Sequence, residues 1–186
     1  MTLRLFFAVE VPAELLELVR AKSAGLRSKW PEARWTTPEN QHLTLKFLGA
    51  TSSDDLDNLV QTGAAVARSH AAAEVALTEL GAFPSARRAR VLWLGISDPA
   101  GVLHGLAAGL SSACESLGYR PEARPYVPHL TLARFKTPVR LGSELTLELS
   151  EALFEVSEVG LWRSHLSPKG ARYELLESLP LMPGRG

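Results

Sequence analysis

One tetrapeptide occurs twice in this chain, and that repeat limits the folds that the chain can adopt. His-Leu-Thr-Leu stands at residues 42–45 and again at residues 129–132, 87 positions apart. Shifting the chain by this offset without gaps also places Pro12 on Pro99. We interpret the match as an internal duplication, because chance repetition of a tetrapeptide together with its surroundings is rare.

The duplication predicts one two-lobed domain. Two copies are too few for a solenoid, in which at least three repeats must stack. A length of 186 residues fits a single domain. We therefore expect one domain over residues 1–186, with copies that start near residues 3 and 90 and are related by an approximate two-fold axis.

Each copy predicts the same order of elements: an apolar strand, a helix, a polar loop and the repeated strand. The first helix begins near Pro12 and keeps its apolar spacing to Leu26, whereas in the second Asp98 has the chemistry of an N-cap and Gly118 that of a C-terminal stop. The pattern predicts an α+β fold with antiparallel sheets. Apolar strands are expected at Leu3–Glu10 and Arg90–Ser97, a further strand at Val75–Phe83, and late strands at Glu144–Leu149, Leu153–Trp162 and Arg172–Leu179.

Strand alternation places the repeated histidine and threonine on one face. In the first copy His42, Thr44 and Lys46 share a face, and Leu45 and Phe47 face the core. Lys46 is therefore a candidate phosphate contact that has no counterpart in the second copy.

The second copy offers His129 and Thr131 on the same face. Arg134 has the opposite parity, so regular strand geometry directs it away from that face. Its participation in a shared site requires a twist, a bulge or the end of the strand.

Two opposed histidines suit phosphodiester chemistry. An imidazole has an ordinary pKa near 6.5, so one histidine can take a proton from the attacking oxygen while the other protonates the leaving oxygen. Thr44 and Thr131 can donate hydrogen bonds to phosphoryl oxygens, and Arg134 can stabilise developing negative charge.

Other residues favour structural interpretations. No carboxylate or cysteine stands at metal-ligand spacing beside either motif, so we expect no metal. His70, His104 and His165 lack the repeated context, and a buried, inert thiol is the expectation for Cys114.

The charge balance excludes a protein that holds long nucleic-acid duplexes. Lys and Arg total 20, as do Asp and Glu, whereas proteins that hold long duplexes carry a large positive excess. The single cysteine and the lack of an apolar run of about 18 residues predict a cytoplasmic protein without a membrane segment. The lack of a long exposed apolar stripe favours a monomer.

At these motifs the chain resembles the 2H phosphoesterase superfamily, and within it the RNA 2′,3′-cyclic phosphodiesterases, also called 2′-5′ RNA ligases. Four segments carry the resemblance: Leu3–Val9, His42–Gly49, Arg90–Gly95 and Pro128–Arg134. The resemblance implies a bilobal fold with a cleft between the lobes. It also implies metal-independent opening of a terminal 2′,3′-cyclic phosphate to a 2′-phosphomonoester, with no cofactor, and a reverse joining reaction.

Residue roles follow from that resemblance alone. It implies that His42 protonates the leaving 3′ oxygen and that His129 acts as the general base. It also implies that Thr44, Thr131 and Arg134 hold the phosphate.

Three alternatives stay open at this point. The substrate could be a 2′-5′ oligonucleotide or a small cyclic nucleotide instead of an RNA 3′ end. The protein could also be a module that binds RNA ends without turnover, although the two intact His/Thr pairs favour turnover.

Overall fold

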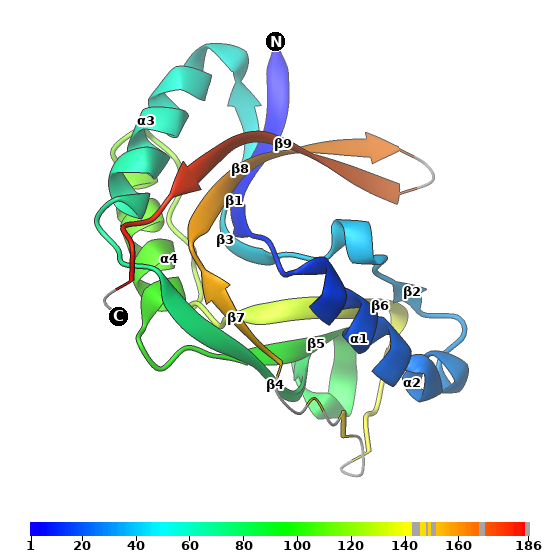
Figure 1. Ribbon diagram of the computed structural model, residues 1–186. Helices are drawn as coiled ribbons and strands as arrows, with labels where there is room; N and C mark the ends of the chain where they lie inside the picture. The colour runs from blue at the N-terminus through cyan, green and yellow to red at the C-terminus, as the bar shows by residue number, and fades with distance from the viewer. Residues whose placement is uncertain (143–145, 148, 150–151, 168–169, 185–186) are drawn as a thin grey trace.

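Two antiparallel sheets form the molecule (Figure 1), and residues of both line one cleft. The computed structural model describes residues 1–142, 146–147, 149, 152–167 and 170–184. The first sheet has the order β3 (Leu43–Ser52), β1 (Thr2–Val9), β8 (Glu158–Ser167) and β9 (Gly170–Pro180). The second has the order β2 (Arg34–Trp35), β6 (His129–Val139), β5 (Ala89–Ser97), β4 (Ala73–Phe83) and β7 (Leu153–Val156).

Helices cover the outside of the sheets. α3 packs against β8 and β9, and α4 packs against α3 and β3, so these two helices lie together on one side of the molecule (Figure 1). The helices are α1 (Ala13–Lys22), α2 (Ala24–Lys29), α3 (Leu56–Ala67) and α4 (Val102–Glu115), with short 3-10 turns η1 (Pro38–Asn40), η2 (Ser53–Asp55) and η3 (Ala86–Arg88). The α+β class with antiparallel sheets around a cleft is confirmed.

The sheets do not divide the chain at residue 90. β2 and β4 come from the first half of the chain but lie in the second sheet, and β8 and β9 from the end of the chain complete the first sheet. The duplication therefore stays a prediction.

Two strands were expected between residues 144 and 162. The expected strand at Leu153–Trp162 is two strands: β7 pairs with β4 in the second sheet, and β8 pairs with β1 in the first. The chain crosses between the sheets at Ser157, so one apolar run serves two different partners. Half of the strand expected at Glu144–Leu149 falls outside the described residues, and the other half, residues 146, 147 and 149, lies in no strand.

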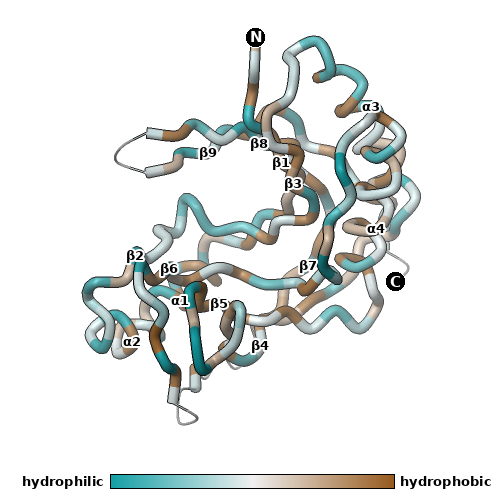
Figure 2. The backbone as a smooth tube through the Cα atoms, turned by 180° about the vertical axis from the view of Figure 1, so that it is seen from behind, coloured by the Kyte–Doolittle hydropathy of each residue, from teal (hydrophilic) through white to brown (hydrophobic). Residues whose placement is uncertain are grey.

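The core is continuous across both layers. Buried side chains of β1, β3 and β5 meet the apolar side of α4, where Leu103, Leu106 and Leu110 have no exposed surface. Figure 2 shows that the most hydrophobic residues lie along the strands at the centre of the molecule. Cys114 is buried within this core, as expected.

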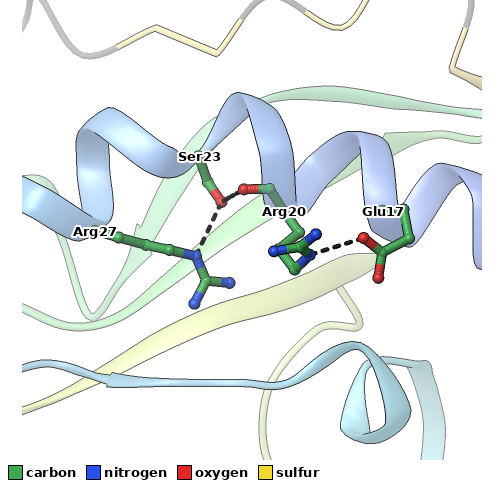
Figure 3. A network of polar contacts seen from close by, with 4 residues as sticks. All are labelled: Glu17, Arg20, Ser23 and Arg27. Carbon is green, nitrogen blue, oxygen red and sulfur yellow. Dashed lines mark hydrogen bonds and ion pairs between the residues drawn. The ribbon is translucent and has the colours of Figure 1, made fainter.

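The first helix is interrupted at Ser23. The apolar spacing predicted one helix to Leu26, but α1 ends at Lys22 and α2 starts at Ala24. The Ser23 hydroxyl donates to the carbonyl of Arg20 and accepts from Nε of Arg27 (Figure 3). A serine hydroxyl that bonds the backbone in this way competes with the helical ladder, which explains the break.

Helix α4 begins later than predicted. Gly101, with φ of 71°, is the N-cap instead of Asp98. Asp98 still caps the helix from outside, because its Oδ2 accepts from the backbone N–H of His104, 3.1 Å away. Gly118, with φ of 88°, follows the end of the helix as predicted.

Candidate active site

Both repeated histidines line one cleft of about 270 Å³ between the sheets. His42 directly precedes β3 of the first sheet, and His129 starts β6 of the second. Thr44, Thr131 and Arg134 line the same cleft. The structure thus brings together all five residues to which the resemblance assigns a role.

A bulge in β3 changes the expected alternation. Phe7 pairs with Lys46 and Ala8 pairs with Thr44, so Leu45 has no partner on β1. Leu45 and Lys46 are both buried as a result, and the next side chain, Phe47, returns to the cleft.

Lys46 therefore does not face the cleft, and its predicted phosphate contact is wrong. Its side chain is 1% exposed, and its Nζ donates to the carbonyl of Arg120 at 2.6 Å. Phe47, expected in the core, is instead 41% exposed. The reason in both cases is the unpartnered Leu45, because an extra residue shifts the side chains that follow it to the other face, here up to the next register shift at Leu48.

The same displacement occurs in β6 and brings Arg134 into the cleft. Leu92 pairs with Ala133 and Trp93 pairs with Thr131, so Leu132 has no partner on β5. This bulge is the feature that Arg134 required in order to share a face with Thr131. Since the two bulges lie 87 positions apart, Arg134 stands where the first copy has Phe47.

His42 lies among aromatic rings. Its centroid is 4.8 Å from that of Phe6 and 4.9 Å from that of Tyr173, which meets it edge-on. The pKa of His42 is lowered to about 4, mainly by burial. A backbone hydrogen bond at Asn40 raises this pKa, and the nearby His129 lowers it.

His129 is oriented by its own strand. Its Nδ1 donates to the carbonyl of Val127 at 2.7 Å, which leaves Nε2 available to the cleft. The rings of Phe83 and Trp93 lie 5.1 and 5.9 Å from it. Burial lowers its pKa; the bond to Val127 raises it, and the charge of Arg134 lowers it.

Sequence reasoning missed several residues that line the cleft, among them Tyr173 and Gln41. Tyr173 comes from β9, far from either motif, and no local pattern marked it. Gln41 precedes the first motif, is 8% exposed, and donates from Nε2 to the carbonyl of Thr131 at 3.4 Å. It thus links the first motif to the strand of the second.

The remaining histidines have partners outside the cleft. His70 bonds the carbonyl of Val66, His104 bonds Asp98, and His165 bonds Glu174. Within the described part of the chain, no three His, Cys, Asp or Glu side chains are grouped so that they could hold a metal ion. No helix among the described residues has the length and apolar character to cross a bilayer.

Comparison with known proteins gives consistent results. The family model described as the 2′-5′ RNA ligase superfamily matches residues 38–168. An RNA 2′,3′-cyclic phosphodiesterase of Methanothermobacter thermautotrophicus is 35% identical over 182 residues, covering 95% of this chain and 98% of the relative. One of Thermus thermophilus is 34% identical over 193 residues, covering 99% and 93%.

A third relative is longer than this chain. The RNA 2′,3′-cyclic phosphodiesterase of Geobacillus stearothermophilus is 31% identical over 180 residues. The match covers 95% of this chain but only 57% of that relative.

Solved structures share the fold. LigT of Escherichia coli complexed with 3′-AMP superposes with a TM-score of 0.81 at 28% identity, covering 97% of this chain and 99% of that one. A crystal structure of a phosphoesterase gives a TM-score of 0.83 at 28% identity, covering 98% and 99%.

Proposed function

The chain belongs to the 2′-5′ RNA ligase superfamily, and on this premise we propose that it is a metal-independent RNA 2′,3′-cyclic phosphodiesterase. It opens a terminal cyclic phosphate and leaves a 2′-phosphomonoester. One observation carries the proposal: two His/Thr pairs from different sheets, with Arg134, line one cleft.

The reaction is a single displacement at phosphorus. A water oxygen attacks the phosphorus, and Nε2 of His129 takes the proton that this water loses. The bond from phosphorus to O3′ breaks, and O3′ takes a proton from His42. The product keeps the phosphate on O2′ and carries a free 3′-hydroxyl.

The remaining side chains hold the phosphoryl group. The hydroxyls of Thr44 and Thr131 donate to nonbridging oxygens from opposite sides of the cleft. The guanidinium of Arg134 stabilises the negative charge that grows in the transition state.

Protonation of His42 depends on the substrate. Its lowered pKa leaves the imidazole neutral at pH 7 in the free protein. A phosphodiester anion in contact with the ring favours the charged form and raises that pKa. The acid therefore gains its proton together with the substrate, which ties catalytic competence to occupancy of the cleft.

A joining reaction uses the same groups in the same direction. If the 5′-hydroxyl of a second RNA replaces water, the step joins the two chains through a 2′-5′ linkage. The proposed ligands are RNA 3′ ends or small nucleotides with a cyclic phosphate. A cytoplasmic location and a monomeric state stay predictions of the sequence.

The test is phosphorus NMR on a short RNA that ends in a 2′,3′-cyclic phosphate, with EDTA present. The wild-type protein is expected to convert the cyclic signal to a 2′-monoester. His42→Ala and His129→Ala should each lower the rate by at least about 10²-fold, since general acid–base catalysis contributes that much.

His104→Gln is the control, because its ring lies outside the cleft and glutamine can still donate to Asp98. Turnover by folded His42→Ala at the wild-type rate would contradict the assigned chemistry. Binding without turnover by the wild-type protein would favour an RNA-end-binding module.

A further inference from the structure

The catalytic cleft continues into a second pocket of about 250 Å³. The two share Thr36, Asn40, Arg134 and Tyr173 as lining residues, so they adjoin each other. The second pocket adds Arg34, from the short edge strand β2. A substrate that reaches Arg134 can therefore extend towards Arg34.

Arg34 and Arg134 are directly opposite each other. They are cross-strand partners in the β2–β6 pair, with Cα atoms roughly 5 Å apart in such a pair. Like charges in this position destabilise a sheet. No described carboxylate forms an ion pair with either guanidinium, and both line the pocket. This arrangement is typical of a site whose missing partner is an anion.

Arg34 also lies close to Gly170, which lines the same pocket. A Cβ built on Gly170, at the start of β9, would lie 2.7 Å from Nη2 of Arg34. The side chain thus extends from the second sheet to the β8–β9 hairpin of the first, and the glycine leaves room for it. Figure 1 shows that hairpin projecting on the same side as β2.

The opposite side of His42 has the reverse charge. A cavity of about 560 Å³ shares Gln41, His42 and Tyr173 with the cleft and is lined by Glu10, Glu39 and Glu158, among others. Burial raises the pKa of Glu10, and the negative charge of Glu158 raises it further. A chain of phosphates is disfavoured on that side.

We propose that Arg34 binds the phosphodiester linking the terminal nucleotide to the one before it, so that the RNA leaves the cleft between β2 and the β8–β9 hairpin. The inference rests on the proposed function and adds a second phosphate site to it. Arg134 holds the cyclic phosphate, and Arg34 holds the next phosphate along the chain. The protein then prefers RNA ends over cyclic mononucleotides.

The test compares a 2′,3′-cyclic mononucleotide, which lacks the second phosphate, with a dinucleotide that has it. Arg34→Gln should lower kcat/KM for the dinucleotide about tenfold, mainly through KM, and leave the mononucleotide unchanged. For the wild-type protein, replacing the linking phosphate of the dinucleotide by a neutral methylphosphonate should lower kcat/KM by the same factor. With Arg34→Gln this replacement should lower kcat/KM no further. Such non-additivity identifies the two groups as partners.

Arg68→Gln is the matched control, since Arg68 is exposed at the end of α3 and lines neither the cleft nor the second pocket. The inference is overturned if Arg34→Gln slows both substrates equally, if neither slows, or if Arg68→Gln produces the selective loss. Failure of the wild-type protein to turn over either substrate would instead contradict the proposed function, and the inference with it.

Discussion

At the scale of single residues, burial governs the chemistry of His42. The imidazole is packed between Phe6 and Tyr173, and its pKa of about 4 follows mainly from lost hydration. The sequence predicted that His42 belongs to a reactive pair, from the repeated context alone. It could not predict this pKa, because Tyr173 comes from a distant strand.

The lowered pKa predicts a loss of stability in acid. The unfolded chain binds a proton at His42 near pH 6.5, whereas the folded protein binds it only near pH 4. The contribution of neutral His42 to the free energy of unfolding is fully present above pH 6.5 and is lost as the pH falls towards 4. At full protonation the loss is roughly 3 kcal/mol.

His42→Gln should remove this dependence. Urea unfolding at pH 7 and at pH 4.5 is expected to show a smaller loss of unfolding free energy for this variant than for the wild-type protein. His165→Gln, which changes a ring bonded to Glu174 outside the pair, should behave like the wild type. Parallel losses in all three proteins would show that His42 titrates normally.

At the scale of elements, an unpartnered leucine that follows the threonine in each repeated strand shapes the site. Leu45 and Leu132 each lack a cross-strand partner, and each shifts the following side chains by one face. Arg134 enters the cleft for this reason, and Lys46 leaves it. Alternation along the sequence predicted the faces of His42 and His129 correctly because both precede the bulge.

Helix packing predicts opposite changes in the free energy of unfolding for two glycine-to-alanine substitutions. A Cβ on Gly63 of α3 would lie 2.6 Å from a ring carbon of Phe7 and 2.7 Å from a methyl group of Leu179. Gly63→Ala should therefore lower the free energy of unfolding by about 1–3 kcal/mol. Gly25 of α2 has no atom within 4 Å of such a Cβ, so Gly25→Ala should raise it by about 0.5–1 kcal/mol.

Thermal or urea unfolding of the two variants checks both signs. Since the two substitutions add the same methyl group within a helix, helix propensity cancels in the comparison. Equal effects would mean that α3 is not packed closely against β1 and β9.

At the scale of the whole molecule, the site exists only where the two sheets meet. Thr44 comes from the first sheet, and Thr131 and Arg134 come from the second. A ligand that contacts both sheets stabilises the folded state over the unfolded chain by mass action. The charge distribution acts at this scale too, with arginines on one side of the cleft and carboxylates on the other.

A 2′-mononucleotide, the proposed type of product, should therefore raise the melting temperature. At a concentration of 100 times its Kd the added stability is about 2.7 kcal/mol. Arg134→Gln should weaken this stabilisation, whereas Arg87→Gln, an exposed change on η3, should preserve it. Equal stabilisation of both variants would place the anion elsewhere.

The sequence by itself determined the α+β class, the two histidine motifs and the inward leucines around them. These follow from local periodicity and from a repeat that any reader of the chain can find. Only the tertiary structure decided the rest: the bulges, the sharing of strands between sheets, the aromatic wall at Tyr173 and the pairing of Arg34 with Arg134. The physical reason is that side-chain alternation belongs to one strand, whereas a bulge, a buried charge or a cross-strand pair depends on which distant segment lies alongside.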